Sequence, residues 1–278
     1  MKYLLSLIIL ASSVSCRSGT TLQEDEIYSR HLQRKVKLTV INTPIPSDRS
    51  KLNLLLLNDG QEVSRLRVKE VVDSLFSNGK IQPLVVVAIH AGNRLQEYGV
   101  AGKPDYAGRG GKAGYYEAFI NNELYPFLKK KTGTRKFRNV AFAGASLGGL
   151  SAFDFSWNHP EKINKVGVFS GSFWWRDKDT TDSTYSDEKN RIMYAKLKNS
   201  RKHPKLQFWF YVGRNEETSD RDHDGLIDVI DDTKDIINLL KQKNPYSQII
   251  YKEVKDAGHD WPYWSAVFPD FLIWAFGK

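Results

Sequence analysis

The stretch FAGASLGGLSAF, residues 142–153, decides the fold prediction for this 278-residue chain. Residues 140–144 have the apolar pattern of a buried strand, and residues 147–157 have the spacing of a helix. Ser146 stands at the bend between them, flanked by glycines that remove the clashes a tight strand-to-helix turn would otherwise cause. The stretch therefore predicts a sharp bend that raises the Ser146 hydroxyl above one edge of a sheet.

Apolar runs of strand length alternate with stretches of helical periodicity along the rest of the chain. The expected strands cover residues 36–41, 52–57, 84–89, 140–144, 165–169, 206–212 and 249–254. The expected helices cover residues 63–76, 115–130, 147–157, 232–243 and 264–275. This alternation predicts one α/β domain over residues 31–278, with a mostly parallel central sheet and helices on both faces. Ligands of such sheets bind beyond the carboxyl ends of the strands.

The chain is basic, with 41 Lys and Arg residues against 32 Asp and Glu residues and a formal net charge of +9. The basic residues are scattered in ones and twos along the sequence, whereas nucleic-acid-binding proteins cluster them. We therefore expect no nucleic-acid partner. A basic surface that faces an anionic cell envelope or an acidic ligand fits the charge better.

The first residues have the layout of an export signal. Lys2 precedes an apolar stretch that is too short to span a bilayer, and small residues lead from it to Cys16. Residues 1–16 resemble a bacterial lipoprotein signal, in which Cys16 is lipidated and becomes the new N-terminus. Residues 17–30 are then expected to form a tether, and the protein to be lipid-anchored in the periplasm or outer membrane with no other membrane contact. An ordinary cleaved secretory peptide is the alternative.

A serine hydroxyl needs a base and an orienting acid to act as a nucleophile, and the chain offers both after later strands. His259 follows the last expected strand and precedes the terminal helix, where the base belongs in the order serine, acid, histidine. The acid should follow the strand over 206–212, and Glu216 is the first carboxylate there. Glu217 and Asp220 remain open as alternatives.

Two backbone amides are candidates for an oxyanion hole, the pair of donors that stabilises negative charge on a substrate oxygen. The Leu147 N–H directly follows the serine at a helix N-terminus. A second donor is expected after the strand over 52–57, where Asp59 and Gly60 form a turn and Gln61 supplies the N–H. Glycine in this turn lets the backbone approach a substrate carbonyl closely.

The segment DRDHDGLIDVID, residues 220–231, has the spacing of a calcium loop. Alternating aspartates, followed by glycine at the sixth position, gather oxygen ligands around one hard cation. The expected ligands are Asp220, Asp222, Asp224, Leu226, Asp228 and Asp231, with Leu226 contributing its carbonyl. Aspartate at the twelfth position departs from the pattern, and a solvated acidic loop is the alternative. Because the loop follows Glu216 closely, a bound Ca²⁺ would be structural and would fix the loop that carries the acid.

Several aromatic side chains fall near expected strand ends or near the histidine. Trp174, Trp175 and Trp261 are candidates for a wall on which an aromatic or sugar ester stacks, with core packing as the alternative. Core packing is the expectation for the tryptophans inside the terminal helix, Trp264 and Trp274. Arg94 either holds an anionic group of the substrate or forms a helical ion pair with Glu97 at i,i+3.

The chain resembles the esterase family of the α/β-hydrolases that includes enterochelin esterase and feruloyl esterases. The matching segments are LLNDGQ (56–61), GASLGG (144–149), SGSFWW (170–175) and AGHDWPYW (257–264), together with Arg94 and Glu97 in NRLQEYG. The resemblance implies the roles assigned above. Ser146 would be the nucleophile, His259 the base and Glu216 the acid, and the amides of Gln61 and Leu147 would be the oxyanion donors. Enterochelin esterase carries an additional N-terminal domain and is cytoplasmic, so the resemblance is to a short, exported member.

The expected function is hydrolysis of a carboxylic ester outside the cytoplasm by a serine esterase that needs no cofactor for its chemistry. The expected substrate is a small-molecule or glycan ester, of the siderophore type or with an aromatic or carbohydrate part. A feruloyl or acetyl-xylan esterase is one alternative. The other, from a different class, is a non-catalytic envelope binding protein that keeps the hydrolase scaffold and is stabilised by calcium.

Overall fold

The computed structural model describes residues 19–278, so the predicted signal at residues 1–16 and the lipidation of Cys16 lie outside the described residues. Its central sheet has eight strands: β1 (Thr21–Ser29), β2 (Arg34–Asn42), β3 (Asn53–Asn58), β4 (Leu84–Ile89), β5 (Val140–Ala145), β6 (Lys165–Phe169), β7 (Gln207–Gly213) and β8 (Ile249–Val254). The α-helices are α1 (Val68–Ser77), α2 (Arg94–Glu97), α3 (Ala113–Phe119), α4 (Tyr125–Thr132), α5 (Leu147–Asn158), α6 (Asp187–Asn190), α7 (Ile192–Asn199), α8 (Asp228–Lys243) and α9 (Trp261–Phe276). A π-helical segment, Ile120–Leu124, joins α3 to α4.

The strands lie in the order β1-β2-β4-β3-β5-β6-β7-β8. β4, β3, β5, β6, β7 and β8 pair in parallel, while β1 and β2 add an antiparallel ribbon at one edge. The predicted mostly parallel sheet is confirmed, and every expected strand is present close to its expected bounds. We call the side on which the parallel strands end the carboxyl edge, and the side on which they begin the amino edge.

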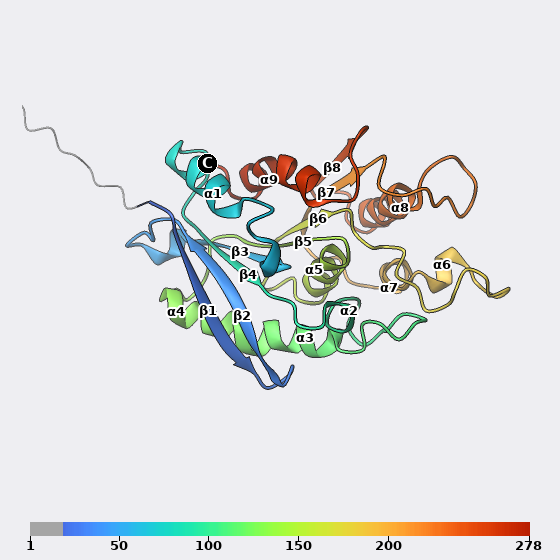
Figure 1. The fold of residues 1–278 in the computed structure, drawn as a ribbon, viewed down its shortest axis with the longest axis horizontal. Coiled ribbons are helices and arrows are strands. Elements are labelled where there is room, and N and C mark those ends of the chain that lie inside the picture. The colour runs from blue at the N-terminus through green and yellow to red at the C-terminus, as the bar shows by residue number, and fades with distance from the viewer. Residues whose placement is uncertain (1–18) are drawn as a thin grey trace, which may run out of the picture.

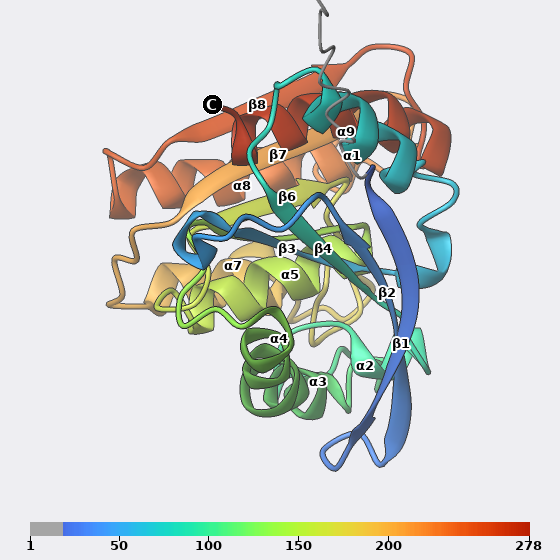
Figure 2. The ribbon, with the colours of Figure 1, turned by 90° about the vertical axis from the view of Figure 1, so that its left-hand side faces the viewer.

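Helices cover both faces of the sheet, which explains why its central strands are apolar at every position (Figures 1 and 2). Successive side chains of a strand point to opposite faces. Leu55 and Leu57 accordingly pack with α1 and α9, whereas Leu54 and Leu56 pack in the cluster that contains α3, α4, α5, α7 and α8. No helix among residues 19–278 is long and apolar enough to cross a membrane.

The tether expected over residues 17–30 is wrong for most of its length, because Thr21–Ser29 forms β1. This strand pairs with β2 from Thr21↔Asn42 to Ser29↔Arg34. An edge strand has one neighbour and one solvated side, so its sequence TLQEDEIYS carries polar residues that look like a linker. Cross-strand charge pairing supports it, as Lys35 Nζ lies 2.8 Å from Glu26 Oε1.

Four helices begin at other residues than the sequence predicts. α1 begins at Val68 rather than at residue 63, because Arg67 has a left-handed backbone with φ 53° and interrupts the helical pattern. α8 begins at Asp228 rather than at residue 232, so the last residues of the acidic segment are helical. α3 begins at Ala113 rather than at residue 115, and α9 begins at Trp261 rather than at residue 264.

Candidate active site

Ser146 occupies a strained bend at the carboxyl edge, between β5 and α5. Its backbone has φ 54° and ψ −125°, a conformation that side chains rarely adopt. Its N–H donates to the Phe169 carbonyl at 2.8 Å, which ties the bend to β6. A Cβ at Gly144 would lie 2.4 Å from the Gly148 carbonyl oxygen, and a Cβ at Gly148 would lie 2.7 Å from Asp59 Oδ2. Only glycine therefore fits at these two positions.

Glu216 and His259 meet at the same edge, after β7 and β8. Nδ1 of His259 lies 2.9 Å from Glu216 Oε2, and the Glu216 side chain is 1% exposed. The other carboxylate oxygen accepts hydrogen bonds from the Ser170 hydroxyl and the Gly213 N–H, both at 2.5 Å. A carboxylate held by three donors orients the imidazole: with Nδ1–H donating to it, Nε2 keeps its lone pair and can accept a proton.

The structure does not join Ser146 to His259 by a hydrogen bond within the described residues. The Ser146 hydroxyl instead lies 3.3 Å from that of Ser172. Trp264 contacts both Ser170 and His259. Its Nε1–H donates to Ser170 Oγ at 2.8 Å, and its ring lies edge-on to the His259 ring, with 5.1 Å between centroids. Catalytic hydrogen bonds are commonly long or poorly aligned without substrate, so Ser146 and His259 stay the predicted nucleophile and base.

The other carboxylates considered for the acid face elsewhere. Glu217 accepts from the Val229 N–H at 2.8 Å, and burial, reinforced by the nearby Asp228, raises its pKa. Asp220 accepts from backbone N–H groups of its own loop. Among the three candidates the structure places Glu216 against the histidine.

The two predicted oxyanion donors are free of acceptors. Neither the Leu147 N–H nor the Gln61 N–H donates a hydrogen bond within the described part of the chain. Gln61 lies in the 3-10 helix Gly60–Glu62, which follows Asp59 with φ 59°. A Cβ at Gly60 would lie 2.7 Å from the Ala88 carbonyl oxygen, so this turn packs directly on β4. The turn is therefore fixed while its amide stays available.

Arg94 holds this turn, and of the two roles considered for it the ion pair with Glu97 is wrong. Nε of Arg94 donates to Asp59 Oδ1 at 2.8 Å and Nη2 to Oδ2 at 3.1 Å. Burial opposes the charge on the guanidinium, but Asp59 outweighs it and the pKa of Arg94 is raised. Glu97 is buried and pairs instead with Arg34, 2.6 Å away. Arg94 and Glu97 therefore both pair with residues outside α2.

The predicted aromatic wall is correct in part. Trp175 is fully buried, and its indole fills a space that Gly110 leaves open, where a Cβ would lie 2.9 Å from Cζ2. Its assignment to substrate binding is therefore wrong, because a ring in the core cannot touch a ligand. Trp174 and Trp261 are half-buried, and Trp261 packs edge-on against the buried Trp264 with 4.9 Å between ring centroids.

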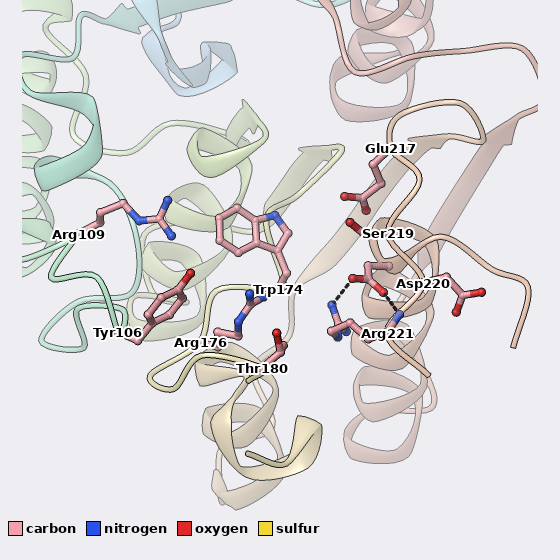
Figure 3. Close-up of a pocket in the computed structure, with 10 residues that line it drawn as sticks. Tyr106, Arg109, Trp174, Arg176, Thr180, Glu217, Ser219, Asp220 and Arg221 are labelled. Carbon is pink, nitrogen blue, oxygen red and sulfur yellow. Dashed lines mark hydrogen bonds and ion pairs between the residues drawn. The ribbon is translucent and has the colours of Figure 1, made fainter. Parts of the chain in front are cut away.

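Trp174 lines a pocket of about 540 Å³ that also contains Glu217, the residue after the proposed acid (Figure 3). Tyr106, Arg109 and Arg176 form one side with it, and the loop that carries Glu217 forms the other. The Arg109 guanidinium lies 5.4 Å from the Trp174 ring centroid and is ion-paired with Asp105. Arg176 lies over the Tyr106 ring and pairs with no carboxylate of residues 19–278. This wall combines aromatic faces with positive charge.

The acidic segment brings three of its predicted ligands together. One oxygen each of Asp220, Asp222 and Asp224 lies within 4.8 Å of the others, and Gly225 has φ 89°, as the turn requires. The assignment of Asp228 as a ligand is corrected, because Arg221 binds its carboxylate. The Arg221 guanidinium lies 2.9 Å from one carboxylate oxygen, and the Arg221 backbone N–H donates to the other at 2.9 Å.

Asp231 lies close to the three grouped aspartates. Burial, and then the negative charges of Asp235, Asp222 and Asp224, raise its pKa to about 6. The donors available are therefore carboxylate oxygens under mutual repulsion, which is the donor chemistry that suits Ca²⁺. The Leu226 carbonyl stays a predicted ligand.

Ser170 and Ser172 were not singled out from the sequence, yet both contact proposed catalytic residues. Ser170 has a left-handed backbone with φ 52° and bridges Glu216 to Trp264. The available signal was its position: it is the first residue after β6, in the segment SGSFWW. Residues directly after a parallel strand lie at the carboxyl edge, where ligands bind.

Three comparisons relate the chain to known proteins. A family model described as "Putative esterase" matches residues 29–275. The uncharacterized protein YbbA of Bacillus subtilis is 25% identical over 228 residues, which cover 80% of this chain and 84% of that protein. The enterobactin esterase of Shigella flexneri superposes with a TM-score of 0.70 and 22% identity over 91% of this chain and 58% of that one. A ferulic acid esterase superposes with a TM-score of 0.68 and 20% identity, over 93% and 98%.

These likenesses to solved structures are likenesses of fold. This chain spans little more than half the length of the enterobactin esterase that it matches, and nearly the full length of the ferulic acid esterase. The described residues thus share a fold with the ferulic acid esterase over nearly its whole length, and function depends on the site that such a scaffold carries.

Proposed function

The chain belongs to the esterase family whose model it matches over residues 29–275, and from this premise we propose that it is a serine hydrolase of carboxylic esters. The observation that carries the proposal is the buried, three-fold hydrogen-bonded Glu216 carboxylate against Nδ1 of His259, beside a strained Ser146. Such strain and such an oriented imidazole have no role in packing. They suit a nucleophile and its base.

The reaction has two steps. Ser146 Oγ attacks the ester carbonyl carbon while Nε2 of His259 takes the hydroxyl proton, and the N–H groups of Gln61 and Leu147 stabilise the resulting oxyanion. The carbon–oxygen bond to the alcohol breaks, and the alcohol leaves with the proton held by His259. Water then attacks the acyl-enzyme by the same route, which releases the acid and restores the serine. Arg94 is a positioning residue here, because it holds the turn of Gln61 through Asp59.

The wall of this pocket that carries Trp174 favours an ester with an aromatic and anionic part, while Glu217, Asp220 and Asp228 give the pocket's other wall negative charge. Trp174 and Tyr106 offer ring faces, and the unpaired Arg176 offers a positive charge. Siderophore-type catecholate esters match this chemistry, and feruloyl esters match its aromatic half. Acetyl-xylan, which has neither feature, is the weaker alternative. Trp261, half-buried next to the histidine loop, is a second stacking surface.

A fluorophosphonate probe tests serine catalysis against the non-catalytic binding protein. The expected result is covalent labelling of Ser146, because only a serine activated by a base attacks the phosphorus rapidly. Labelling is read by peptide mass spectrometry, with Ser172→Ala as a control that keeps the proposed nucleophile. An unlabelled, folded wild-type chain would favour the binding protein.

We further propose that Ca²⁺ binds the acidic segment and is structural. Asp220, Asp222 and Asp224 would hold it, with Asp231 nearby and Asp228 retained by Arg221. The cation would relieve the repulsion among these carboxylates and order the loop that follows Glu216. No step of ester hydrolysis uses it.

Calcium is expected to raise Tm by about 5–10 °C at a concentration near 100 times its Kd, since a ligand of the native state stabilises it. The measurement is a thermal melt in calcium and in excess chelator. Asp222→Asn should remove most of the shift, and the exposed Asp256→Asn should leave it intact. Equal melting curves with and without chelator would contradict the site.

The proposed location is outside the cytoplasm, with an anchor at Cys16. Support comes from the sequence of residues 1–16, whose order of Lys2, an apolar stretch, small residues and cysteine is that of a lipoprotein signal. Replacing Cys16 with serine should abolish the incorporation of labelled fatty acid into the protein, because the acylated thiol is then missing.

A further inference from the structure

The amino edge of the sheet is strongly basic, although the lysines and arginines are scattered in the sequence. The loops that enter β3 to β8 cover residues 43–52, 78–83, 133–139, 159–164, 200–206 and 244–248. Their carboxylates are Asp48 and Glu161, and each is ion-paired with a lysine of its own loop. Exposed basic residues dominate the same loops, and we call the following set the basic end: Arg49, Lys51, Arg135, Lys136, Arg138 and Lys205.

The fold brings these loops side by side. Thr134 Oγ1 donates to the Arg49 carbonyl, and the Arg138 N–H donates to the Leu52 carbonyl at 2.8 Å. Gln207 N–H donates to the Asn164 carbonyl on the way into β7. Figure 2 looks onto this side of the molecule, with the loop before β3, the end of α4 and the C-terminus facing the viewer.

The opposite edge carries both signs of charge. The aspartates of residues 220–231 gather after β7, while Lys103, Arg109, Lys112, Arg176 and Lys189 follow β4 and β6. The excess of positive charge therefore lies at the amino edge, away from the candidate active site. Such a charge distribution orients a protein in the field of a charged surface.

Two further observations identify the surface that the basic end faces. The chain enters β1 at this end, because Thr21 pairs with Asn42, which pairs with Val85 near the start of β4. Figure 1 shows the start of β1 on the same side as the C-terminus and the loop before β3. In the loop that enters β8, Tyr246 is 96% exposed. An exposed tyrosine among cations is typical of a membrane–water interface, where the ring is apolar and its hydroxyl wet.

We propose that the basic end docks on the anionic surface of a lipid bilayer, so that the active site faces away from the membrane. A lipid anchor fixes a chain to a bilayer but leaves its orientation free. Each Lys or Arg near an anionic leaflet strengthens binding about fivefold, and the contribution falls off within a Debye length. Several such residues on one end suffice to set the orientation, and a substrate in the aqueous compartment then reaches the carboxyl edge unobstructed.

The test uses the full chain with Cys16→Ser, so that no lipid contributes, and vesicles of phosphatidylglycerol with phosphatidylcholine or of phosphatidylcholine alone. We expect binding to the anionic vesicles that is screened by salt, and weak binding to the neutral ones. Arg135→Glu/Lys136→Glu/Lys205→Glu should weaken the anionic binding about a hundredfold or more. Every variant carries the same N-terminal residues, whose contribution cancels in the ratio between the two vesicle types.

The matched control applies the same charge change elsewhere, as Lys103→Glu/Lys112→Glu/Lys189→Glu, at exposed lysines away from the amino edge. It should bind at least tenfold more tightly than the first variant. Equal losses in both variants would overturn the proposal, because net charge rather than one end would then govern binding. Preference for heparin or DNA over the vesicles would also overturn it, in favour of a polyanion partner. Unchanged Tm and hydrolysis of a soluble ester show that the first variant is folded.

A label reports the orientation directly. The chain has one cysteine, so Cys16→Ser/Tyr246→Cys accepts a single environment-sensitive dye. Its fluorescence should shift to the blue on anionic vesicles, whereas the same dye at Ser183, in the loop before α6, should not respond. A response at residue 183 and none at 246 would reverse the orientation and refute the proposal.

Discussion

Replacing Ser146 with alanine is expected to lower kcat for an activated aryl ester by about 10⁶ while leaving the fold intact. Without the hydroxyl there is no acyl-enzyme, and the remaining amides and pocket can only bind the ester and stabilise charge. Alanine also removes little that supports the fold, since within residues 19–278 the Ser146 hydroxyl hydrogen-bonds to the Ser172 hydroxyl and to no other group. Steady-state hydrolysis of a nitrophenyl ester measures the loss.

Ser172→Ala is the matched control, because its hydroxyl lies 3.3 Å from the proposed nucleophile. We expect it to lose less than about 100-fold in kcat, since its hydroxyl has no base to activate it. The reverse result, with Ser172→Ala inactive and Ser146→Ala active, would transfer the nucleophile to the neighbouring residue. Near-normal turnover in both variants would remove serine catalysis from this chain.

The second large effect is expected for Glu216→Gln, with kcat lower by about 10³–10⁴. The amide is nearly isosteric, so packing survives, but it presents a donor and no charge. Nδ1 of His259 then loses the acceptor that keeps its proton, and Nε2 no longer holds the lone pair that the serine needs. The loss should appear in kcat more than in KM, because the carboxylate acts through the imidazole and does not touch the ester.

Glu217→Gln is the control for this change, one residue further along the same loop. Its carboxylate accepts from the Val229 N–H and does not face His259, so kcat should stay within about tenfold of wild type. Thermal melts of both variants separate catalysis from stability. If Glu217→Gln were the inactive variant, the histidine would have to change partners in the working enzyme.

The central fold could be predicted because local pattern and global structure agree there. β3 and β4 are buried at all positions, and a short apolar run between turns is readable as a covered parallel strand. β1 was missed because a solvated edge strand and a polar linker have similar composition. The short helices α2, α6 and α7 were missed because one or two turns give too little periodicity to detect.

The candidate site, like the fold, could be predicted only in part. His259 and Glu216 were predictable because chain order and strand ends define where a base and an acid can lie. Contacts between residues far apart in the chain could not be predicted. Arg94 binds Asp59, which is 35 residues away in the chain, rather than Glu97 on its own helix. The two adjacent tryptophans of SGSFWW differ in burial. Trp174 lines the pocket and Trp175 lies in the core, and no sequence spacing distinguishes them.

Trp264, which holds Ser170 and abuts His259, belongs to α9, downstream of every strand. Under the proposed mechanism, His259 is therefore held in place only after α9 has packed on the sheet. A delay in the folding of α9 would thus delay activity, although the serine, the acid and the base all precede this helix in the chain.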